Sequence, residues 1–339
     1  MYNIALIGCG RISKKHIESI EKNNFNLVAL CDIDETKNNF DIPFYTDYKQ
    51  MLEKEDIDIV SILTPSGYHY KNALDILKYK KHLIIEKPIT LRYDEAETLV
   101  QKAKEENIKL FTVKQNRFNL PIKKLKEIID KGLLGDIFLA TTRVRWARGQ
   151  EYYDLDSWRG SWRLDGGVIS NQAIHHLDLL LYLVGEIESV YAKSINAFAN
   201  IEAEDTVVAT IKFKNGALGT FEATTATRPK DIEGSISILG NQGMVEVGGF
   251  AANKIIKWEV KETINIEQFS QNPENIYGFG HIEFYKDVVE SLKNNTKAIC
   301  EMEEGIKSIK VMNAMYESIE TNQEIFLDNF TVKKARIGK

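Results

Sequence analysis

Residues 57–88, IDIVSILTPSGYHYKNALDILKYKKHLIIEKP, decide the fold of this chain. The apolar run 57–63 ends at a Thr-Pro pair, which is typical of a buried parallel strand whose carboxyl end opens into a loop. A helical pattern follows, and a second apolar run, 82–85, leads into Glu86-Lys87-Pro88. Because ligands of open α/β sheets bind at the carboxyl ends of strands, Lys87 is a candidate catalytic residue.

On this stretch alone, Lys87 is explained equally well as an ordinary surface lysine at a strand end. Pro88 restricts the backbone before it, which favours a well-positioned lysine over one on a flexible loop. The Lys87-Pro88 peptide is also a candidate cis bond, since cis bonds are essentially confined to proline. Other parts of the chain have to separate the two interpretations.

A glycine-rich turn lies between the first strand and the first helix that we expect. Residues 3–7 are apolar, GCGRIS follows at 8–13, and a helical pattern begins at Ser13. In a GxGxxG-type turn the glycines let backbone N–H groups approach a pyrophosphate; here Ser13 replaces the third glycine. The next apolar run ends at Asp32, close to where an acidic residue binds the adenine ribose. A carboxylate there repels a 2′-phosphate, so the sequence favours NAD over NADP.

Strands and helices alternate up to residue 119, which predicts an N-terminal NAD-binding Rossmann domain over residues 1–119 with a doubly wound parallel sheet. Residues 120–339 predict an α+β domain for substrate binding and oligomerisation, with a large, mostly antiparallel open sheet. Its extended segments are expected at 137–145, 189–197, 206–213, 217–226, 235–239 and 244–247. Its helices are expected at 121–131, 168–184, 281–293 and 303–321.

Composition excludes several classes of protein. The 339 residues carry a formal net charge of −5, which gives no overall electrostatic footprint for nucleic acid. The three cysteines are too scattered for a disulfide framework or a zinc site, and we expect them to be reduced packing residues. No apolar run approaches the roughly 20 residues of a membrane span. We therefore expect a cytoplasmic protein without nucleic-acid or membrane partners and without a metal.

The helix expected after Gly166-Gly167 carries a second candidate site. Asn171 and His175 are four residues apart and Asp178 is three further on, so one helical face would present all three. Histidine takes and gives protons near neutrality, which suits a general base. His176 is adjacent, and spacing does not say which histidine faces a ligand. A core or surface histidine on an amphipathic helix explains the pattern as well.

The loop at 146–166 is rich in arginine and aromatic residues. Guanidinium groups pair with phosphate or carboxylate, and aromatic faces stack on flat rings such as uracil. As a group these residues favour an anionic, partly aromatic substrate; the alternative is a surface loop whose aromatics simply pack. Some of them could serve a neighbouring subunit, because we expect a homo-oligomer, a dimer or tetramer, through the C-terminal sheet. The residues are Arg148, Tyr152, Tyr153, Trp158, Arg159, Trp162 and Arg163.

The ordered motifs GCGRIS, CDID, LTPSGYHY, EKP and DGG followed by NQAIHHLD resemble the Gfo/Idh/MocA family of nicotinamide-dependent sugar oxidoreductases. In that family the EKP lysine and the histidine after the glycines lie beside the nicotinamide, which implies Lys87 and His175 here. The family commonly has Asp where this chain has Asn171. That departure, with KQNRFN at 114–119 and SWRGSWRLDGG at 157–167, resembles the branch of UDP-N-acetylglucosamine or UDP-N-acetylglucosaminuronate 3-dehydrogenases.

This resemblance implies an NAD-dependent dehydrogenase that oxidises a secondary hydroxyl, C3 of a UDP-linked sugar, in the synthesis of surface polysaccharide such as O-antigen. Its catalytic residues would be Lys87, His175 and Asn171. The cofactor-binding residues expected are Gly8, Gly10, Arg11, Ile12, Asp32, Thr64, Pro65, His69, Glu86, Lys87, Gln115, Trp158 and Arg159. The substrate-binding residues expected are Lys87, Arg148, Tyr152, Asn171, Gln172 and His175.

In these roles His175 takes the hydroxyl proton, since an alkoxide is too basic to form freely in water. The Lys87 ammonium stabilises the developing charge on oxygen and orients the hydroxyl. Asn171, being neutral, hydrogen-bonds the sugar without repelling a uronate carboxylate. Two alternatives stay open: a dehydrogenase of a free sugar or inositol with the same fold, and a non-catalytic NAD(H)-sensing protein.

Overall fold

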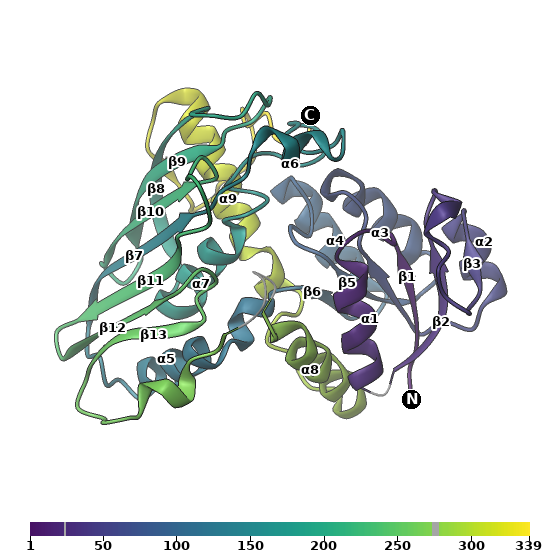
Figure 1. Ribbon diagram of the computed structural model, residues 1–339, viewed down its shortest axis with the longest axis horizontal. Helices are drawn as coiled ribbons and strands as arrows, with labels where there is room; N and C mark the ends of the chain where they lie inside the picture. The colour runs from purple at the N-terminus through teal and green to yellow at the C-terminus, as the bar shows by residue number, and fades with distance from the viewer. Residues whose placement is uncertain (24, 273–277) are drawn as a thin grey trace. The chain divides into compact units, whose positions relative to one another are not determined.

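A computed structural model describes residues 1–23, 25–272 and 278–339 of the chain (Figure 1). By its internal contacts the chain divides into two compact units. The first consists of Met1–Lys114 and His281–Ile306, and the second of Gln115–Gly280 and Lys307–Lys339. The sequence-based boundary groups everything after residue 119 in one domain, whereas residues 281–306 join the first unit.

The first unit is built on a six-stranded parallel sheet with the strand order β3-β2-β1-β4-β5-β6. Its strands are β1 (Asn3–Ile7), β2 (Asn26–Cys31), β3 (Phe44–Tyr45), β4 (Ile59–Ile62), β5 (His82–Ile85) and β6 (Leu110–Thr112). Every residue of β4 is buried, as the apolar run 57–63 predicts. The strand order reverses between β1 and β4, where ligands of doubly wound sheets bind. The predicted Rossmann fold is confirmed.

The helices described in this unit mostly follow a strand. They are α1 (Ser13–Lys22), α2 (Tyr48–Lys54), α3 (His69–Leu77), α4 (Tyr93–Glu105) and α8 (Gly280–Asn294), with 3-10 turns at Glu35–Lys37 and Ser66–Tyr68. The buried face of α1 includes His16, Ile17 and Ile20, which recur at helical spacing. This face brings a histidine into the interior of the unit together with the apolar residues.

Residues 281–306 pack with the first unit through specific contacts. The side-chain amide of Asn23 donates to the carbonyl of Ile282 at 2.9 Å, and the Tyr285 ring meets Phe25 edge-on at 5.6 Å. Further along, the N–H of Thr112 in β6 donates to Cys300 O at 3.0 Å. These contacts join residues far apart in sequence, so no local pattern predicts them.

The second unit contains an eight-stranded sheet in the order β13-β12-β11-β7-β10-β9-β8-β14. Among the strand pairs that the structure describes in this sheet, only β7–β10 is parallel, which confirms a mostly antiparallel sheet. Its strands are β7 (Ile137–Arg145), β8 (Ile187–Ile195), β9 (Thr206–Phe213), β10 (Leu218–Thr224), β11 (Glu233–Gly240), β12 (Gly243–Gly248), β13 (Lys254–Glu259) and β14 (Ile325–Phe326). β13 and β14 were not expected, because β13 interleaves lysines with apolar residues and β14 is two residues long.

The helices of this unit are α5 (Leu120–Asp130), α6 (Gln150–Asp154), α7 (Ile174–Val184) and α9 (Glu303–Thr321), with 3-10 turns at Gln115–Phe118 and Ile266–Phe269. Of α9, the part from Lys307 onward belongs to this unit. The helix predicted at 168–184 begins only at Ile174, so Asn171 lies on the turns before it. Backbone bonding there departs from the α-helical pattern, because the N–H of Ala173 donates to Val168 O, five residues back, at 2.8 Å. The shared helical face expected for Asn171, His175 and Asp178 therefore applies only to the last two.

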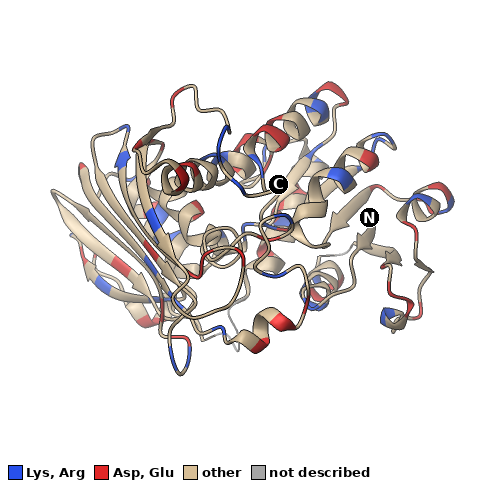
Figure 2. Cartoon of the chain, turned by 90° about the horizontal axis from the view of Figure 1, so that it is seen from above, with Lys and Arg blue, Asp and Glu red and all other residues tan. Residues whose placement is uncertain are grey.

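Charged residues of both signs are interspersed on helices and loops of each unit (Figure 2). This distribution agrees with the small net charge of −5. Among the described residues, none of the helices combines the length and the apolar character that a membrane crossing requires.

Candidate active site

The glycine turn after β1 has the geometry of a dinucleotide-binding turn. Gly8 has a φ of +101°, and a Cβ there would lie 2.8 Å from the backbone of Leu63, so this position requires glycine. At Gly10 a Cβ would have no atom within 4 Å among the described residues, apart from its two chain neighbours. The N-cap residue of α1, Ile12, makes no side-chain cap. The first N–H groups of α1 therefore have no side-chain cap, and Gly10 leaves free space beside them. This combination suits the binding of a pyrophosphate.

Asp32 directly follows β2 and is a buried carboxylate, 8% exposed. It accepts the backbone N–H of Cys9 at 2.7 Å and that of Asp34 at 3.0 Å, so it is anchored beside the glycine turn. Lys37 also lies here, with its ammonium 3.1 Å from Asp32 Oδ2. No sequence motif indicates Lys37, whose charge partly offsets the repulsion that Asp32 exerts on a 2′-phosphate.

The predicted residues of the central stretch surround the turn after β5. Lys87-Pro88 is a cis peptide, as predicted. His69 joins two segments, because its Nδ1 lies 2.7 Å from Pro88 O and its Nε2 lies 2.7 Å from Thr64 O. Glu86 is buried and its Oε2 accepts the backbone N–H of Lys87 at 2.9 Å. Thr64, His69, Glu86 and Lys87 are thus brought together, with Pro65 at the start of the following 3-10 turn.

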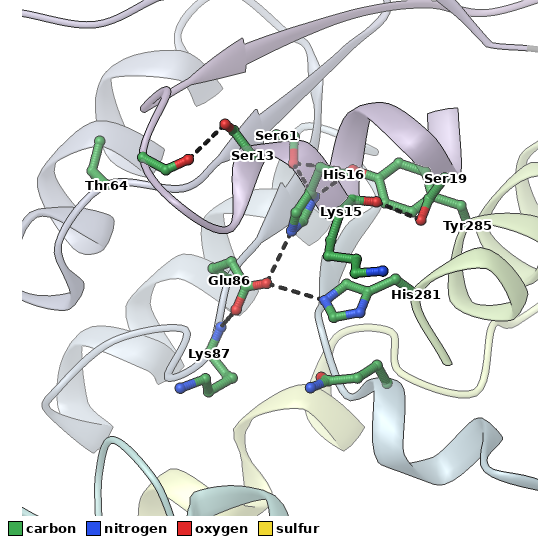
Figure 3. Close-up of polar contacts among 12 residues, drawn as sticks. Ser13, Lys15, His16, Ser19, Ser61, Thr64, Glu86, Lys87, His281 and Tyr285 are labelled. Carbon is green, nitrogen blue, oxygen red and sulfur yellow. Dashed lines mark hydrogen bonds and ion pairs between the residues drawn. The ribbon is translucent and has the colours of Figure 1, made fainter. Parts of the chain in front are cut away.

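Glu86 also belongs to a buried cluster that the sequence did not indicate. Its Oε1 lies 2.9 Å from His16 Nε2 and 3.6 Å from His281 Nε2 (Figure 3). The potential metal-ligating atoms of these three residues lie within 4.8 Å of one another. The direct His16–Glu86 hydrogen bond occupies the space that an ion between them would need, and the cluster is buried. We interpret it as a hydrogen-bonded network.

His175 and Gln115 meet in the second unit. His175 is 8% exposed on α7, and the side-chain amide nitrogen of Gln115 lies 3.3 Å from its Nε2. Asp178, on the same helix, instead forms a two-pronged ion pair with Arg117, at 2.7 and 2.8 Å. Asp178 therefore fixes α7 against the 115–118 turn.

His176 has a different environment from its neighbour. It is fully buried, and its ring meets Trp146 edge-on at 5.9 Å. Burial lowers its pKa to about 4, so it is neutral in the working range of most enzymes. A Cβ at Gly234 would lie 3.0 Å from its Nε2, which shows how closely β11 packs on this ring. These contacts are those of a core histidine.

Asn171 is held by a carboxylate that the sequence analysis did not single out. Its amide nitrogen donates to Asp165 Oδ1 at 2.5 Å, and Asp165 Oδ2 accepts the N–H of Gly160 at 2.8 Å. Asp165 is the first residue of the DGG motif and is 2% exposed. The neutral Asn171 thus has a negative charge directly beside it.

The segment after DGG is supported by Glu204. Its Oε1 accepts the N–H of Ile169 and the hydroxyl of Tyr316, both at 3.0 Å. A Cβ at Gly167 would lie 2.1 Å from Glu204 O, so this glycine is required for close packing. Burial raises the pKa of Glu204 to about 7. The signal for this residue was the second glycine of the motif, whose partner could not be identified from sequence.

Several predicted ligand-binding residues gather around the hydroxyl of Tyr152. Arg159 Nη1 donates to it at 2.7 Å and Gln172 Nε2 lies 3.5 Å away. The Arg159 guanidinium stacks on the rings of Tyr152 and Trp158, each 4.5 Å from the ring centre. The aromatic–cationic cluster consists of Arg148, Tyr152, Trp158, Arg159 and Gln172.

Arg148, three residues after the end of β7, completes this cluster. Its guanidinium lies 5.5 Å from the Tyr152 ring centre and pairs with Asp231 at 2.8 Å. Tyr153, in contrast, is buried and its hydroxyl lies 2.8 Å from Thr225 Oγ1. Trp162 packs edge-on against Tyr316 at 5.4 Å, and Arg163 is exposed. The loop therefore contains both the aromatic–cationic cluster and aromatic residues that simply pack, as the alternative interpretation of a surface loop predicts.

Comparison with family models assigns both parts of the chain to one oxidoreductase family. Residues 2–114 match its NAD-binding Rossmann fold, and residues 126–327 match its C-terminal alpha/beta domain.

Solved structures and curated proteins with similar chains carry related descriptions. The WlbA dehydrogenase from Bordetella pertussis, crystallised with NADH and UDP-GlcNAcA, is 36% identical, with a TM-score of 0.92 over 96% of this chain and 97% of that one. The WlbA dehydrogenase from Chromobacterium violaceum, with the same two ligands, is 36% identical, with a TM-score of 0.90 over 96% and 95%. The myo-inositol 2-dehydrogenase of Thermotoga maritima is 25% identical over 96% of this chain and 98% of its own.

Proposed function

Because this chain belongs to the Gfo/Idh/MocA family and is an NAD-dependent oxidoreductase, we propose that it oxidises C3 of a UDP-linked N-acetylamino sugar or its uronate. The observation that carries this proposal is the 36% identity, over 96% of the chain, to two dehydrogenases crystallised with NADH and UDP-GlcNAcA. A place in nucleotide-sugar synthesis for surface polysaccharide follows from that substrate class.

His175 is the general base in this proposal. The amide N–H of Gln115 can only donate, so its contact with His175 Nε2 requires a lone pair on that nitrogen. A neutral imidazole is the form that can take a proton from a hydroxyl group. The core environment of His176 supports the choice of His175. NAD, when bound, accepts the hydride from the carbon.

Lys87 stabilises the negative charge that develops on the substrate oxygen. A fixed ammonium group acts more strongly on a developing charge than mobile water does, because it needs no reorganisation during the reaction. The hydrogen bond between the Lys87 N–H and Glu86 holds the backbone from which this side chain extends.

We assign ligand recognition to the aromatic–cationic cluster and Asn171, with Trp158 and Arg159 contacting the cofactor and the other residues contacting the substrate. Arginine pairs with phosphate or carboxylate, and the rings of Tyr152 and Trp158 are flat surfaces suited to a base. Asn171, held by Asp165, hydrogen-bonds the sugar. The Asp165 carboxylate places a negative charge beside Asn171, so this part of the site is not neutral.

Thermal protection tests the substrate class. With NAD present, about 100 Kd of a UDP-N-acetylamino sugar should stabilise the native protein by about 2.7 kcal/mol and raise its melting temperature, while free N-acetylglucosamine should not. Free UDP is the matched control for contacts made by the nucleotide alone. Protection by free sugars or inositols and not by UDP-sugars would favour the second candidate, an inositol or free-sugar dehydrogenase, which the Thermotoga maritima relative represents.

A further inference from the structure

The turn that carries Lys87 is held from inside the first unit by a chain of buried polar groups. Glu86 Oε2 accepts the backbone N–H of Lys87 at 2.9 Å, and Glu86 Oε1 lies 2.9 Å from His16 Nε2. His16 Nδ1 lies 2.7 Å from the Tyr285 hydroxyl. Ser61 Oγ is 3.3 Å from the same hydroxyl. This series of hydrogen bonds links α8, α1 and β4 to Glu86, the residue that precedes Lys87.

Side-chain chemistry fixes the direction of these hydrogen bonds. The Lys87 N–H can only donate, and an ionised carboxylate can only accept, so both oxygens of Glu86 act as acceptors. His16 then donates through Nε2, and the Nδ1 of the neutral ring accepts from the Tyr285 hydroxyl. Ser61 in turn donates to Tyr285. In each of these hydrogen bonds the donor therefore lies on the side away from Glu86, and Glu86 is the final acceptor.

The protonation states that burial favours agree with this direction. Burial raises the pKa of Glu86, but hydrogen bonds from His16 and His281 outweigh it and hold that pKa well below the usual range. Burial lowers the pKa of His16 and raises that of Tyr285. Glu86 is then ionised, His16 neutral and Tyr285 protonated, which is the set that the hydrogen bonds require.

We infer that Glu86 is a positioning residue for Lys87 and that His16 and Tyr285 hold Glu86 in place. The inference rests on the proposed catalytic role of Lys87. In Figure 3 the Lys87 side chain points away from the Glu86 carboxylate, and the backbone N–H makes the contact. Glu86 therefore acts on where the chain places Lys87. A misplacement of about 1 Å in an active site can cost about 10²-fold in rate.

A double-mutant cycle on Glu86 and Lys87 tests this coupling. Glu86→Gln keeps the size of the side chain and removes one of the two acceptor oxygens. In the wild-type background it should lower single-turnover hydride transfer about 10- to 100-fold at saturating NAD. In the Lys87→Met background it should lower the remaining rate by less than about twofold, because there is no ammonium left to position.

Glu301→Gln is the matched control. Glu301 is also buried in the first unit, and it accepts from Ala298 N at 2.9 Å and Ser291 Oγ at 3.2 Å, without a contact to Glu86 or Lys87 among those described. It should lower thermal stability and leave hydride transfer within about twofold of wild type. A Glu86→Gln loss of equal size in both backgrounds, or no loss in either, overturns the inference. A wild-type rate for Lys87→Met alone overturns the proposed role of Lys87 instead.

If the Glu86→Gln variant does not fold, the Tyr285→Phe variant tests the same inference. It removes only the hydroxyl that donates to His16, and the ring packing on Phe25 remains. We expect a loss of about 3- to 10-fold in hydride transfer, again absent in the Lys87→Met background. An equal loss in both backgrounds would mean that the network has a purely structural role, and would contradict the inference.

Discussion

At the scale of single residues, the two adjacent histidines of α7 differ in what surrounds them. His175 meets the amide of Gln115, whereas His176 is packed against Trp146 in the core. His175→Ala should lower hydride transfer about 10²- to 10⁴-fold and leave NAD affinity near wild type, since the imidazole acts on the hydroxyl proton. The rising limb of the wild-type pH–rate profile should disappear in this variant.

The control is the neighbouring residue. His176→Gln should keep the rising limb, with a rate within about threefold of wild type. Loss of the limb in His176→Gln, with His175→Ala nearly silent, would mean that His176 is the base.

His176 leads to a prediction about stability and pH. Its pKa in the folded state is about 4, below the value of about 6.5 in the unfolded chain. The folded state therefore favours the neutral ring, and this contribution is present above pH 6.5 and lost as the pH falls toward 4. The difference is about 3 kcal/mol at full extent. The melting temperature of the wild type should fall more steeply between pH 6.5 and 4 than that of His176→Gln; parallel curves would contradict the shift.

Lys37 leads to a prediction about the cofactor. Asp32 should make NAD bind at least about tenfold tighter than NADP, which is about 1.4 kcal/mol. Lys37→Ala should widen this preference about three- to tenfold, because the ammonium that lies 3.1 Å from Asp32 no longer offsets its charge. Calorimetric titration with both cofactors measures the ratio. Equal wild-type affinities would contradict the role of Asp32, and an unchanged ratio would contradict that of Lys37.

At the scale of elements, a buried ion pair fixes α7. Arg117 and Asp178 are 2% and 1% exposed, and the Arg117 guanidinium also lies 4.6 Å from the Tyr182 ring centre. Arg117→Met should lower the free energy of unfolding by about 3–5 kcal/mol, because it leaves Asp178 charged and buried. Lys22→Met, which removes an exposed pair with Glu18 on α1, should cost less than about 1 kcal/mol. Equal losses in urea unfolding would contradict this difference.

Sequence patterns predicted most elements because their signals are local. The apolar runs that became β4 and β5 and the glycines at 8 and 10 need only neighbours in the chain to be interpreted. The start of α7 at Ile174 was not predicted, because the apolar periodicity of 168–174 does not reveal that Ala173 N–H bonds five residues back, to Val168 O. The same holds for the site residues. Lys87 and His175 were predicted from motifs, whereas the His16–Glu86 and Asn171–Asp165 contacts depend on tertiary packing that no motif indicates.

At the scale of the whole molecule, one face of the eight-stranded sheet carries exposed apolar residues. Val208 is 54% and Leu218 is 58% exposed on the neighbouring strands β9 and β10. We propose that a second copy of the chain covers this face, giving a dimer or tetramer. Val208→Glu combined with Leu218→Glu should shift the protein toward monomer in sedimentation velocity. A wild-type monomer at micromolar concentration, or an unchanged oligomer in the double variant, would contradict this proposal.

The reduction of NAD tests the central claim most directly. The protein is mixed with NAD and, in parallel, with UDP-N-acetylglucosamine, its uronate, the corresponding free sugars and myo-inositol, and absorbance at the NADH band is followed through a single turnover. We predict NADH formation with one of the two UDP-sugars, loss of most of that rate in His175→Ala, and no signal from the free sugars. NADH formation with a free sugar or inositol and none with either UDP-sugar would contradict the account.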